Sequence, residues 1–211
     1  MDELAAVLLD APLFRDRSEA GLAVATLLPA LGAQTLVVGL ARGGVQVAAE
    51  IAVERGWALD VLAVRKVRHP HQPEYALGAV APRRSGFYVR ARNGLTESEL
   101  AAAVAAALRE ADELDRRLHA GHPPAERADR PVVLVDDGLA TGATMTAAAR
   151  WARSGGAGPV VAAVPVGARP SVAPMLDEVD LFYCPHVRDD FYAVGVWYAD
   201  FSQLSDDATS P

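Results

Sequence analysis

Mostly apolar runs recur along the chain, and most of them lead into a turn and then a helical pattern. The runs cover residues 35–40, 59–67, 132–135, 160–166 and 181–184, with a shorter run at 86–89. The run over residues 59–67 differs from the others, because it alternates at first and then becomes basic. Apolar runs of this length are typical of strands buried on both faces of a parallel sheet. Their alternation with helical patterns predicts an α/β fold.

Capping residues and apolar spacing indicate where the helices begin. Ser18 is a favourable N-cap for the first helix. Thr96 and Glu99 form a capping box that opens a long helix ending near His119. The charged flank of this helix, which includes Glu110, is predicted to be a solvated face or a subunit contact rather than a chemical site. Shorter helices are predicted over residues 45–55, 145–153 and 171–178.

The most informative stretch covers residues 132–144 and reads VVLVDDGLATGAT. The strand ends at Asp136 and Asp137, and open α/β sheets bind ligands at the carboxyl ends of their strands. Two glycines in the following loop let a ligand approach the backbone. The first amide groups of the next helix, with the hydroxyls of Thr141 and Thr144, form a natural phosphate site. A sugar phosphate would satisfy both the donors and the carboxylates.

An alternative interpretation is an ordinary strand, turn and helix cap without a ligand. It requires both acids, both glycines and both threonines of the stretch to be coincidental. A second turn argues against coincidence, because residues 35–40 lead into Ala41, Arg42, Gly43 and Gly44 and then into a helix. An arginine at a helix start is poorly placed with respect to the helix dipole, which argues for an anion nearby.

Basic residues gather at the end of the run over residues 59–67. Arg65 and Lys66 are followed by a polar segment with two prolines, at residues 69–75, which predicts a loop. A basic strand end followed by a polar loop would suit a lid over a polyanion. We expect this lid to cover about residues 66–90, with Glu74 and Tyr75 as closing residues. His69 and His71 have the spacing of a metal-ligand pair, but no second pair accompanies them, so a plain loop is favoured.

The central stretch resembles the phosphoribosyl pyrophosphate signature of type I phosphoribosyltransferases, in which a hydrophobic strand, two acids and a small-residue loop end in T-G-x-T. The resemblance implies a five-stranded, mostly parallel sheet with helices on both faces, a flexible lid and a C-terminal hood. It implies that Asp136 and Asp137 hold the ribose hydroxyls. It also implies that they bind Mg²⁺ indirectly, through those hydroxyls or through water. It assigns the 5-phosphate to Gly138, Leu139, Ala140, Thr141, Gly142, Ala143 and Thr144.

The same resemblance extends to the pyrophosphate. Arg42, Gly43 and Gly44 match the family's pyrophosphate loop, which often contains a cis peptide bond, here expected between Ala41 and Arg42. Arg65 and Lys66 resemble the Arg-Lys pair that adenine-type members carry before their flexible loop. Arg42 and Lys66 would stabilise the departing pyrophosphate, and with Asp136 and Asp137 they are the predicted catalytic residues.

The hood is expected over about residues 185–201, which are rich in aromatic residues. Tyr192, Ala193, Val194 and Gly195, with Asp200, resemble the base-binding pattern of purine-type members, although the spacing to Asp200 is one residue longer. Phe191, Tyr192 and Asp200 are the predicted base contacts, and the alternative is that the rings only cover the core.

Two functions remain open. The first is a phosphoribosyltransferase that moves a ribose 5-phosphate group to an acceptor, expected to be a nucleobase as in nucleotide salvage, and releases pyrophosphate. The second is a non-catalytic sensor of phosphoribosyl pyrophosphate, and a vestigial structural role is a third interpretation. Hypoxanthine- and guanine-type members carry an Asp where Ala140 stands, so a general base would have to come from Glu74, Asp189 or Asp190.

Composition limits the remaining possibilities. The 211 residues are enough for one domain over 1–211, with a disordered tail expected at 205–211. A net charge of −7 argues against general nucleic-acid binding. The acidic start lacks the basic residues of a signal peptide, and no run approaches the ~20 apolar residues that span a membrane. The single Cys184 fits a reducing cytoplasm. We expect a cytoplasmic homo-oligomer, with a dimer as the simplest case.

Overall fold

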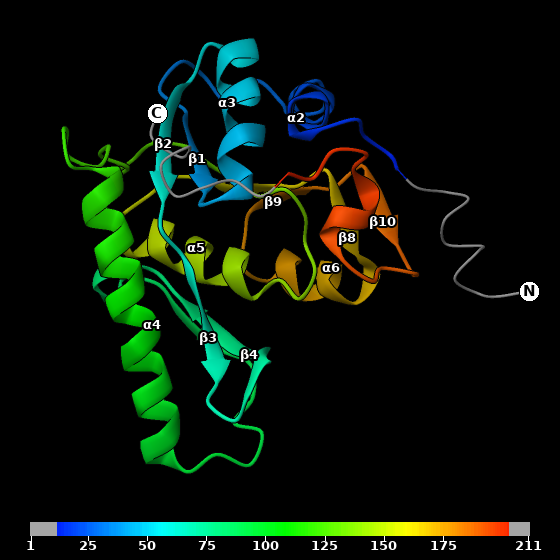
Figure 1. Ribbon diagram of the computed structural model, residues 1–211. Helices are drawn as coiled ribbons and strands as arrows, with labels where there is room; N and C mark the ends of the chain where they lie inside the picture. The colour runs from blue at the N-terminus through cyan, green and yellow to red at the C-terminus, as the bar shows by residue number, and fades with distance from the viewer. Residues whose placement is uncertain (1–11, 203–211) are drawn as a thin grey trace, which may run out of the picture.

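The computed structural model describes residues 12–202 and centres on a five-stranded parallel sheet (Figure 1). The strands are β1 (Leu36–Leu40), β2 (Ala58–Leu62), β6 (Val132–Val135), β7 (Val160–Ala163) and β9 (Leu181–Tyr183). Their order is β2-β1-β6-β7-β9, and each neighbouring pair is parallel. The predicted α/β class is therefore confirmed, and the two strands that lead into the glycine-rich turns lie side by side.

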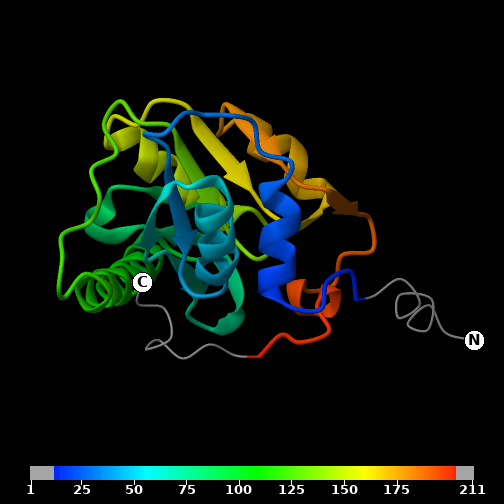
Figure 2. The same cartoon turned by 90° about the horizontal axis from the view of Figure 1, so that it is seen from above.

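Helices cover both faces of this sheet (Figures 1 and 2). Alternate residues of each strand point to opposite faces, so Val37 packs in one apolar cluster and Leu36 and Val38 in the other. The first cluster includes residues of α2 (Arg17–Ala25) and α3 (Gly43–Arg55), and the second includes residues of α5 (Ala143–Ser154) and α6 (Arg169–Leu176).

The first described helix begins earlier than predicted. Its N-cap is Asp16 rather than Ser18, because the Asp16 carboxylate accepts the backbone N–H of Glu19 at 2.9 Å from an extended backbone position. Arg17 is therefore the first helical residue, and its side chain is buried.

A second, antiparallel sheet stands beside the first. It consists of β3 (Arg65–His69), β4 (Gln72–Val80) and β5 (Phe87–Val89), with a short 3₁₀ turn, η1 (Pro82–Arg84), before β5. The single strand predicted over residues 59–67 was wrong, since the chain leaves the first sheet after Leu62 and enters the second at Arg65.

The loop predicted over residues 69–75 was also wrong, because these residues form a tight hairpin in which His69 pairs with Gln72. Pro73 is tolerated in β4 because it has no ladder partner on either side. The register with β3 shifts between Arg68 and His69 and passes over residues 73–75, and β5 pairs only with Gly78–Val80. The flexible lid expected over residues 66–90 is thus an ordered sheet over most of its length, and its movement stays a prediction.

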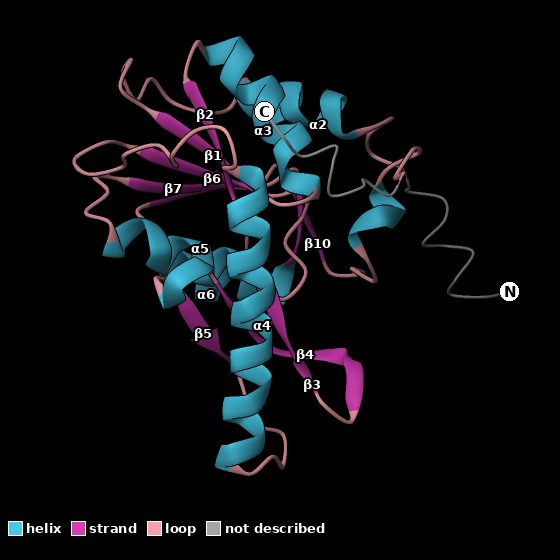
Figure 3. Ribbon diagram, turned by 60° about the vertical axis from the view of Figure 1, so that its left-hand side comes forward, coloured by secondary structure: helices cyan, strands magenta, loops and turns pink. Residues whose placement is uncertain are grey.

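The long helix α4 (Glu97–Leu118) packs against this second sheet and reaches the edge of the first (Figure 3). Its predicted capping box is confirmed, with the Thr96 N–H donating to Glu99 at 2.9 Å and the Glu99 N–H to Thr96 at 3.3 Å. Val104 packs in a cluster with Val67 of β3, whereas Leu114 packs with Val61 of β2.

The apolar run over residues 160–166 also divides. β7 ends at Ala163, and β8 (Val166–Ala168) follows Pro165 and pairs in parallel with β10 (His186–Arg188). Residues 185–201 hold β10 and the 3₁₀ turn η2 (Val194–Trp197). The segment before α2 holds residues 197–199 in place through two backbone hydrogen bonds. The Phe14 N–H donates to the Trp197 carbonyl at 3.1 Å, and the Ala199 N–H donates to the Phe14 carbonyl at 2.9 Å. The predicted tail at 205–211 lies outside the described residues.

Within residues 12–202, no helix combines the length and the apolar character needed to cross a membrane.

Candidate functional site

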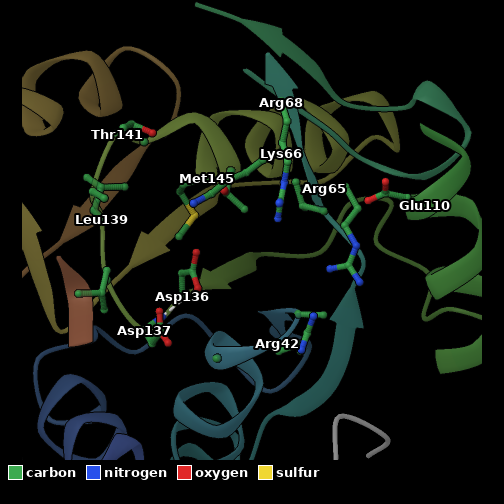
Figure 4. Close-up of a pocket in the computed structure, with 18 residues that line it drawn as sticks. Arg42, Arg65, Lys66, Arg68, Glu110, Asp136, Asp137, Leu139, Thr141 and Met145 are labelled. Atoms are coloured by element: carbon green, nitrogen blue, oxygen red, sulfur yellow. Dashed lines mark hydrogen bonds between the residues drawn. The ribbon is translucent and has the colours of Figure 1, made fainter. Parts of the chain in front are cut away.

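A cavity of about 370 Å³ opens at the carboxyl ends of β1 and β6, beside the start of β3 (Figure 4). Most of the residues predicted for ligand binding line it. The lining consists of Ala41, Arg42, Gly43, Val64, Arg65, Lys66, Arg68, Glu110, Asp136, Asp137, Gly138, Leu139, Ala140, Thr141, Gly142, Thr144, Met145 and Val194. The expectation that the two glycine-rich turns meet at one site is therefore met in the geometry.

The loop between β6 and α5 forms the wall predicted for a phosphate. Gly142 has a φ of 76°, a left-handed conformation that favours glycine, and it turns the chain into α5 at Ala143. The first amides of a helix have no partner within the helix, so this end of α5 suits an anion. Thr141 and Thr144 line the cavity here.

Two of the predicted phosphate residues also have structural tasks, and their part in phosphate binding stays a prediction. The Leu139 N–H donates to the Val166 carbonyl at 2.9 Å, so that amide is committed to β8. Ala143 is buried in the core and does not line the cavity. The loop is further fixed by Ser171 of α6, whose hydroxyl donates to the Ala140 carbonyl at 2.6 Å.

The two acids have different surroundings. The carboxylate of Asp136 faces the cavity and accepts the Asp137 N–H at 3.0 Å (Figure 4). Asp137 forms a salt bridge with Arg17, whose Nε lies 2.9 Å from Asp137 Oδ2. The two acids thus differ in how far they are free to meet a ligand.

Burial raises the pKa of both carboxyls. For Asp136 the rise is large, and the charge of Asp137 adds to the effect of burial. For Asp137 burial is again the main cause, and the nearby Arg17 opposes it by favouring the charged form. Lys66 also favours the charged form of both acids, which places its ammonium group within electrostatic reach of them.

The turn between β1 and α3 forms the opposite wall. The Ala41–Arg42 peptide bond is cis, as the resemblance implied. Gly43 packs against Asp137 so closely that a Cβ atom at this position would overlap the carboxylate. Gly44 does not line the cavity, because it packs against the Val135 carbonyl and the Asp136 backbone.

Basic side chains from β3 reach the cavity from a third side. Arg65 and Lys66 were predicted from the sequence, whereas Arg68 was not. The signal for Arg68 was present, because residues two apart on a strand share a face and Lys66 is two residues away. Glu110 of α4 also lines the cavity and faces Arg65 (Figure 4), and its place on the charged flank of an amphipathic helix gave no hint of this.

A second cavity, of about 360 Å³, adjoins the first and shares Lys66, Arg68 and Glu110 with it. Its other lining residues come from the β3–β4 turn and from one face of α4: Pro70, His71, Glu99, Ala102, Ala103, Ala106 and Ala107. The space next to the basic side chains therefore continues along α4.

The predicted base contacts of the hood do not reach the cavity lining. Tyr192 is 90% exposed, Phe191 packs on Trp197, and the Asp200 carboxylate accepts the Ser202 N–H at 3.0 Å. From η2 it is Val194 that lines the cavity. These three residues stay a prediction for a bound acceptor.

The general-base candidates named from sequence lie elsewhere as well. Glu74 is exposed on the β3–β4 hairpin, Asp189 pairs with Arg169, and Asp190 pairs with Arg188. Among residues 12–202, Glu110 is therefore the carboxylate that shares the cavity with the two aspartates.

The donor set fits a magnesium ion held jointly with a substrate. Within residues 12–202, no group of three or more His, Cys, Asp or Glu side chains converges to form a metal cage. Mg²⁺ commonly binds through one or two carboxylates together with substrate phosphates. A buried carboxylate at Asp136, with its pKa raised, would gain from a cation beside it.

Comparisons with known proteins bear on this geometry. The model of the phosphoribosyl transferase domain family matches residues 20–200. The chain belongs to this family. The matched residues include the loop after β6, the turn after β1 and the basic strand β3.

This phosphoribosyl transferase domain is also similar to individual proteins of known sequence or structure. The solved structure of TT1426 from Thermus thermophilus is 39% identical, with a TM-score of 0.77 over 93% of this chain and 95% of that one. A Mycobacterium tuberculosis protein, Rv0571c, provisionally named a phosphoribosyl transferase, is 41% identical over 92% of this chain. The chain spans 45% of the length of that relative. AQ2163 from Aquifex aeolicus, at 13% identity and a TM-score of 0.52 over 94% of this chain and 96% of that one, shares the fold.

Proposed function

We propose that this phosphoribosyl transferase domain binds phosphoribosyl pyrophosphate and transfers its ribose 5-phosphate group to a small acceptor, such as a nucleobase, with release of pyrophosphate. The observation that carries the proposal is the convergence of three elements on one cavity. The start of α5 suits a phosphate, Asp136 suits the ribose hydroxyls, and Arg42 and Lys66 suit a pyrophosphate.

The chain's own residues would act mainly by orientation and charge. Asp136 would hold the ribose hydroxyls, which fixes C1 of the sugar relative to the two anionic ends. Arg42, Arg65 and Lys66 would bind the pyrophosphate and stabilise the charge that develops as its bond to C1 breaks. Mg²⁺, held beside Asp136 together with the ligand, would supply further neutralisation of the leaving group.

The acceptor's position is less constrained by the fold. Val194 of the hood region lines the main cavity, and the second cavity offers further space beside Lys66 and Arg68. Glu110 stands between the two cavities and is placed to accept a proton or hydrogen bond from an acceptor nitrogen. We propose Glu110 as the general base, because Ala140 stands where hypoxanthine- and guanine-type members carry an Asp.

The alternative function is a sensor that binds phosphoribosyl pyrophosphate without turnover. Such a protein would need the phosphate loop, Asp136 and positive charge to bind the pyrophosphate, but it could lose the further basic residues that stabilise a departing pyrophosphate. The cluster of Arg42, Arg65, Lys66 and Arg68 around one cavity therefore favours the enzyme.

The experiment incubates the protein with phosphoribosyl pyrophosphate, Mg²⁺ and a panel of nucleobases, and measures released pyrophosphate. We expect release with one or a few bases, and loss of that release with EDTA. Lys66→Ala should lower the rate by about 10²-fold or more, since it removes a charge from the leaving-group site. Tight binding of the sugar pyrophosphate with no release for any base would favour the sensor instead.

A further inference from the structure

Arg17 is the least expected contact of the central acids. It comes from the first turn of α2, 120 residues away in sequence, and its Nε donates to Asp137 Oδ2 at 2.9 Å. The two side chains are only 8% and 14% exposed. The first turn of a helix disfavours a cation, because the helix dipole is positive there. Its buried carboxylate partner accounts for an arginine at this place.

The same guanidinium also holds the C-terminal segment. Its Nη1 donates to the Ser202 carbonyl at 3.1 Å, and its Cζ lies 3.9 Å from the centre of the Phe201 ring. The Tyr198 hydroxyl donates to the backbone carbonyl of Asp137 at 2.6 Å. Asp137 is thus held through its side chain by α2 and through its backbone by the segment that follows η2.

These contacts of Arg17 and Tyr198 fix the Asp137 carboxylate at a closely packed position. Asp137 lies next to Asp136 in sequence and touches Gly43 of the β1–α3 turn. Without Arg17, two adjacent carboxylates would repel each other in a poorly solvated site. The Asp137 side chain would then be free to leave the position that Gly43 accommodates.

We propose that Arg17 is a positioning residue for phosphoribosyl pyrophosphate binding, which fixes the Asp137 carboxylate between Asp136 and Gly43 and thereby links the 197–202 segment to the central loop. This inference rests on the proposed function. It assigns different tasks to the two acids: Asp136 meets the ligand, and Asp137 with Arg17 shapes the place where the ligand sits.

A double-mutant cycle tests whether Arg17 acts through Asp137. The affinity for phosphoribosyl pyrophosphate with Mg²⁺ is measured by calorimetry for the wild type, Arg17→Gln, Asp137→Asn and the double variant, at a temperature where all are folded. We expect Arg17→Gln to weaken binding about tenfold or more, and the double variant to bind about as well as Asp137→Asn alone, because the two residues act as one unit.

Arg55 provides a matched control. It also holds neighbouring backbone through its guanidinium, donating to the Leu28 and Pro29 carbonyls at 2.9 Å and 2.8 Å, and it stacks on Trp57, away from the cavity lining. Arg55→Gln should lower the thermal midpoint while affinity stays within about twofold. Arg17→Lys keeps the charge but not the planar guanidinium, so it should bind more tightly than Arg17→Gln and less tightly than the wild type. Arg17→Lys also replaces Arg17→Gln in the cycle if that variant fails to fold.

The outcomes separate the two proposals. Unchanged affinity in both Arg17 variants, or losses for Arg17→Gln and Asp137→Asn that multiply in the double variant, would overturn the positioning role and leave the proposed function standing. A wild-type chain that binds no phosphoribosyl pyrophosphate would overturn the proposed function, and the positioning role with it.

Discussion

The adjacent aspartates Asp136 and Asp137 differ in whether the surrounding protein neutralises their charge. Asp137 is compensated by Arg17, whereas Asp136 faces the cavity, and burial raises its pKa well above the usual range. The sequence predicted that both acids belong to the site, because their place at a strand end is a local property. It could not predict their difference, since Arg17 lies 120 residues from Asp137 in sequence and meets it only in the folded chain.

The first prediction concerns Asp136 in the unliganded protein. Its pKa is raised in the folded state, so the folded state keeps the proton longer than the unfolded chain. Its contribution to stability is therefore favourable below the unfolded pKa, near 3.9, and is lost as pH rises toward the folded value. Asp136→Asn should accordingly be more stable than the wild type at neutral pH, by a margin that disappears in acid. Urea unfolding across pH measures it.

Asp180 provides a control, because its pKa is shifted in the opposite direction to that of Asp136. The Val160 N–H donates to its carboxylate at 2.7 Å, which lowers its pKa, so its stabilising contribution is present above the unfolded pKa. Asp180→Asn should be less stable than the wild type at neutral pH and should approach it in acid. If Asp136→Asn followed the same course as Asp180→Asn, the raised pKa of a buried Asp136 carboxyl would be contradicted.

Breaking the Arg17–Asp137 pair should have a different signature. Asp137→Asn leaves a buried guanidinium without its charged partner, which costs up to about 3–5 kcal/mol. Removing a carboxylate whose pKa is raised by burial offsets part of this cost. We expect a clear fall in the free energy of unfolding at neutral pH, in contrast to Asp136→Asn. Equal stability of the two variants would contradict the difference between the acids.

At the scale of elements, the site is the meeting of two strand-to-helix turns with a hairpin. Both turns were predictable, because each carries glycines directly after a buried strand and the carboxyl ends of parallel strands share one edge. The hairpin was not, because two prolines and polar residues between His69 and Tyr75 are typical of a loop. Only the pairing of Arg65–His69 with β4 shows that these residues belong to a sheet.

The contact between the two turns gives the next prediction. Gly43 leaves no room for a Cβ beside the Asp137 carboxylate, so Gly43→Ala must displace one turn from the other. We expect a stability loss of about 1–3 kcal/mol, typical of overpacking, together with weaker binding of phosphoribosyl pyrophosphate. Gly121→Ala is the matched control, since its Cβ would meet nothing within 4 Å. Equal behaviour of the two variants would show that this contact does not shape the site.

At the scale of the whole molecule, positive side chains are concentrated at the cavity where an anion would bind. The chain carries a net charge of −7, yet Arg42, Arg65, Lys66 and Arg68 gather at one cavity. The sequence indicated the basic cluster on β3, but the distance between it and Arg42 depends on the crossing from the first sheet to the second. The pairing of residues 13–15 with residues 197–200 could not be predicted from local patterns either, because it joins the two ends of the described chain. The predicted dimer and cytoplasmic location stay predictions.

A crystal structure with phosphoribosyl pyrophosphate and Mg²⁺ tests the central claim most directly. The account predicts the 5-phosphate within hydrogen-bond distance, about 2.7–3.2 Å, of the backbone amides between Thr141 and Thr144. It also predicts the ribose hydroxyls on Asp136, with the pyrophosphate beside Arg42 and Lys66. A sugar bound away from Asp136, with its 5-phosphate among the β3 side chains instead of at the start of α5, would contradict it.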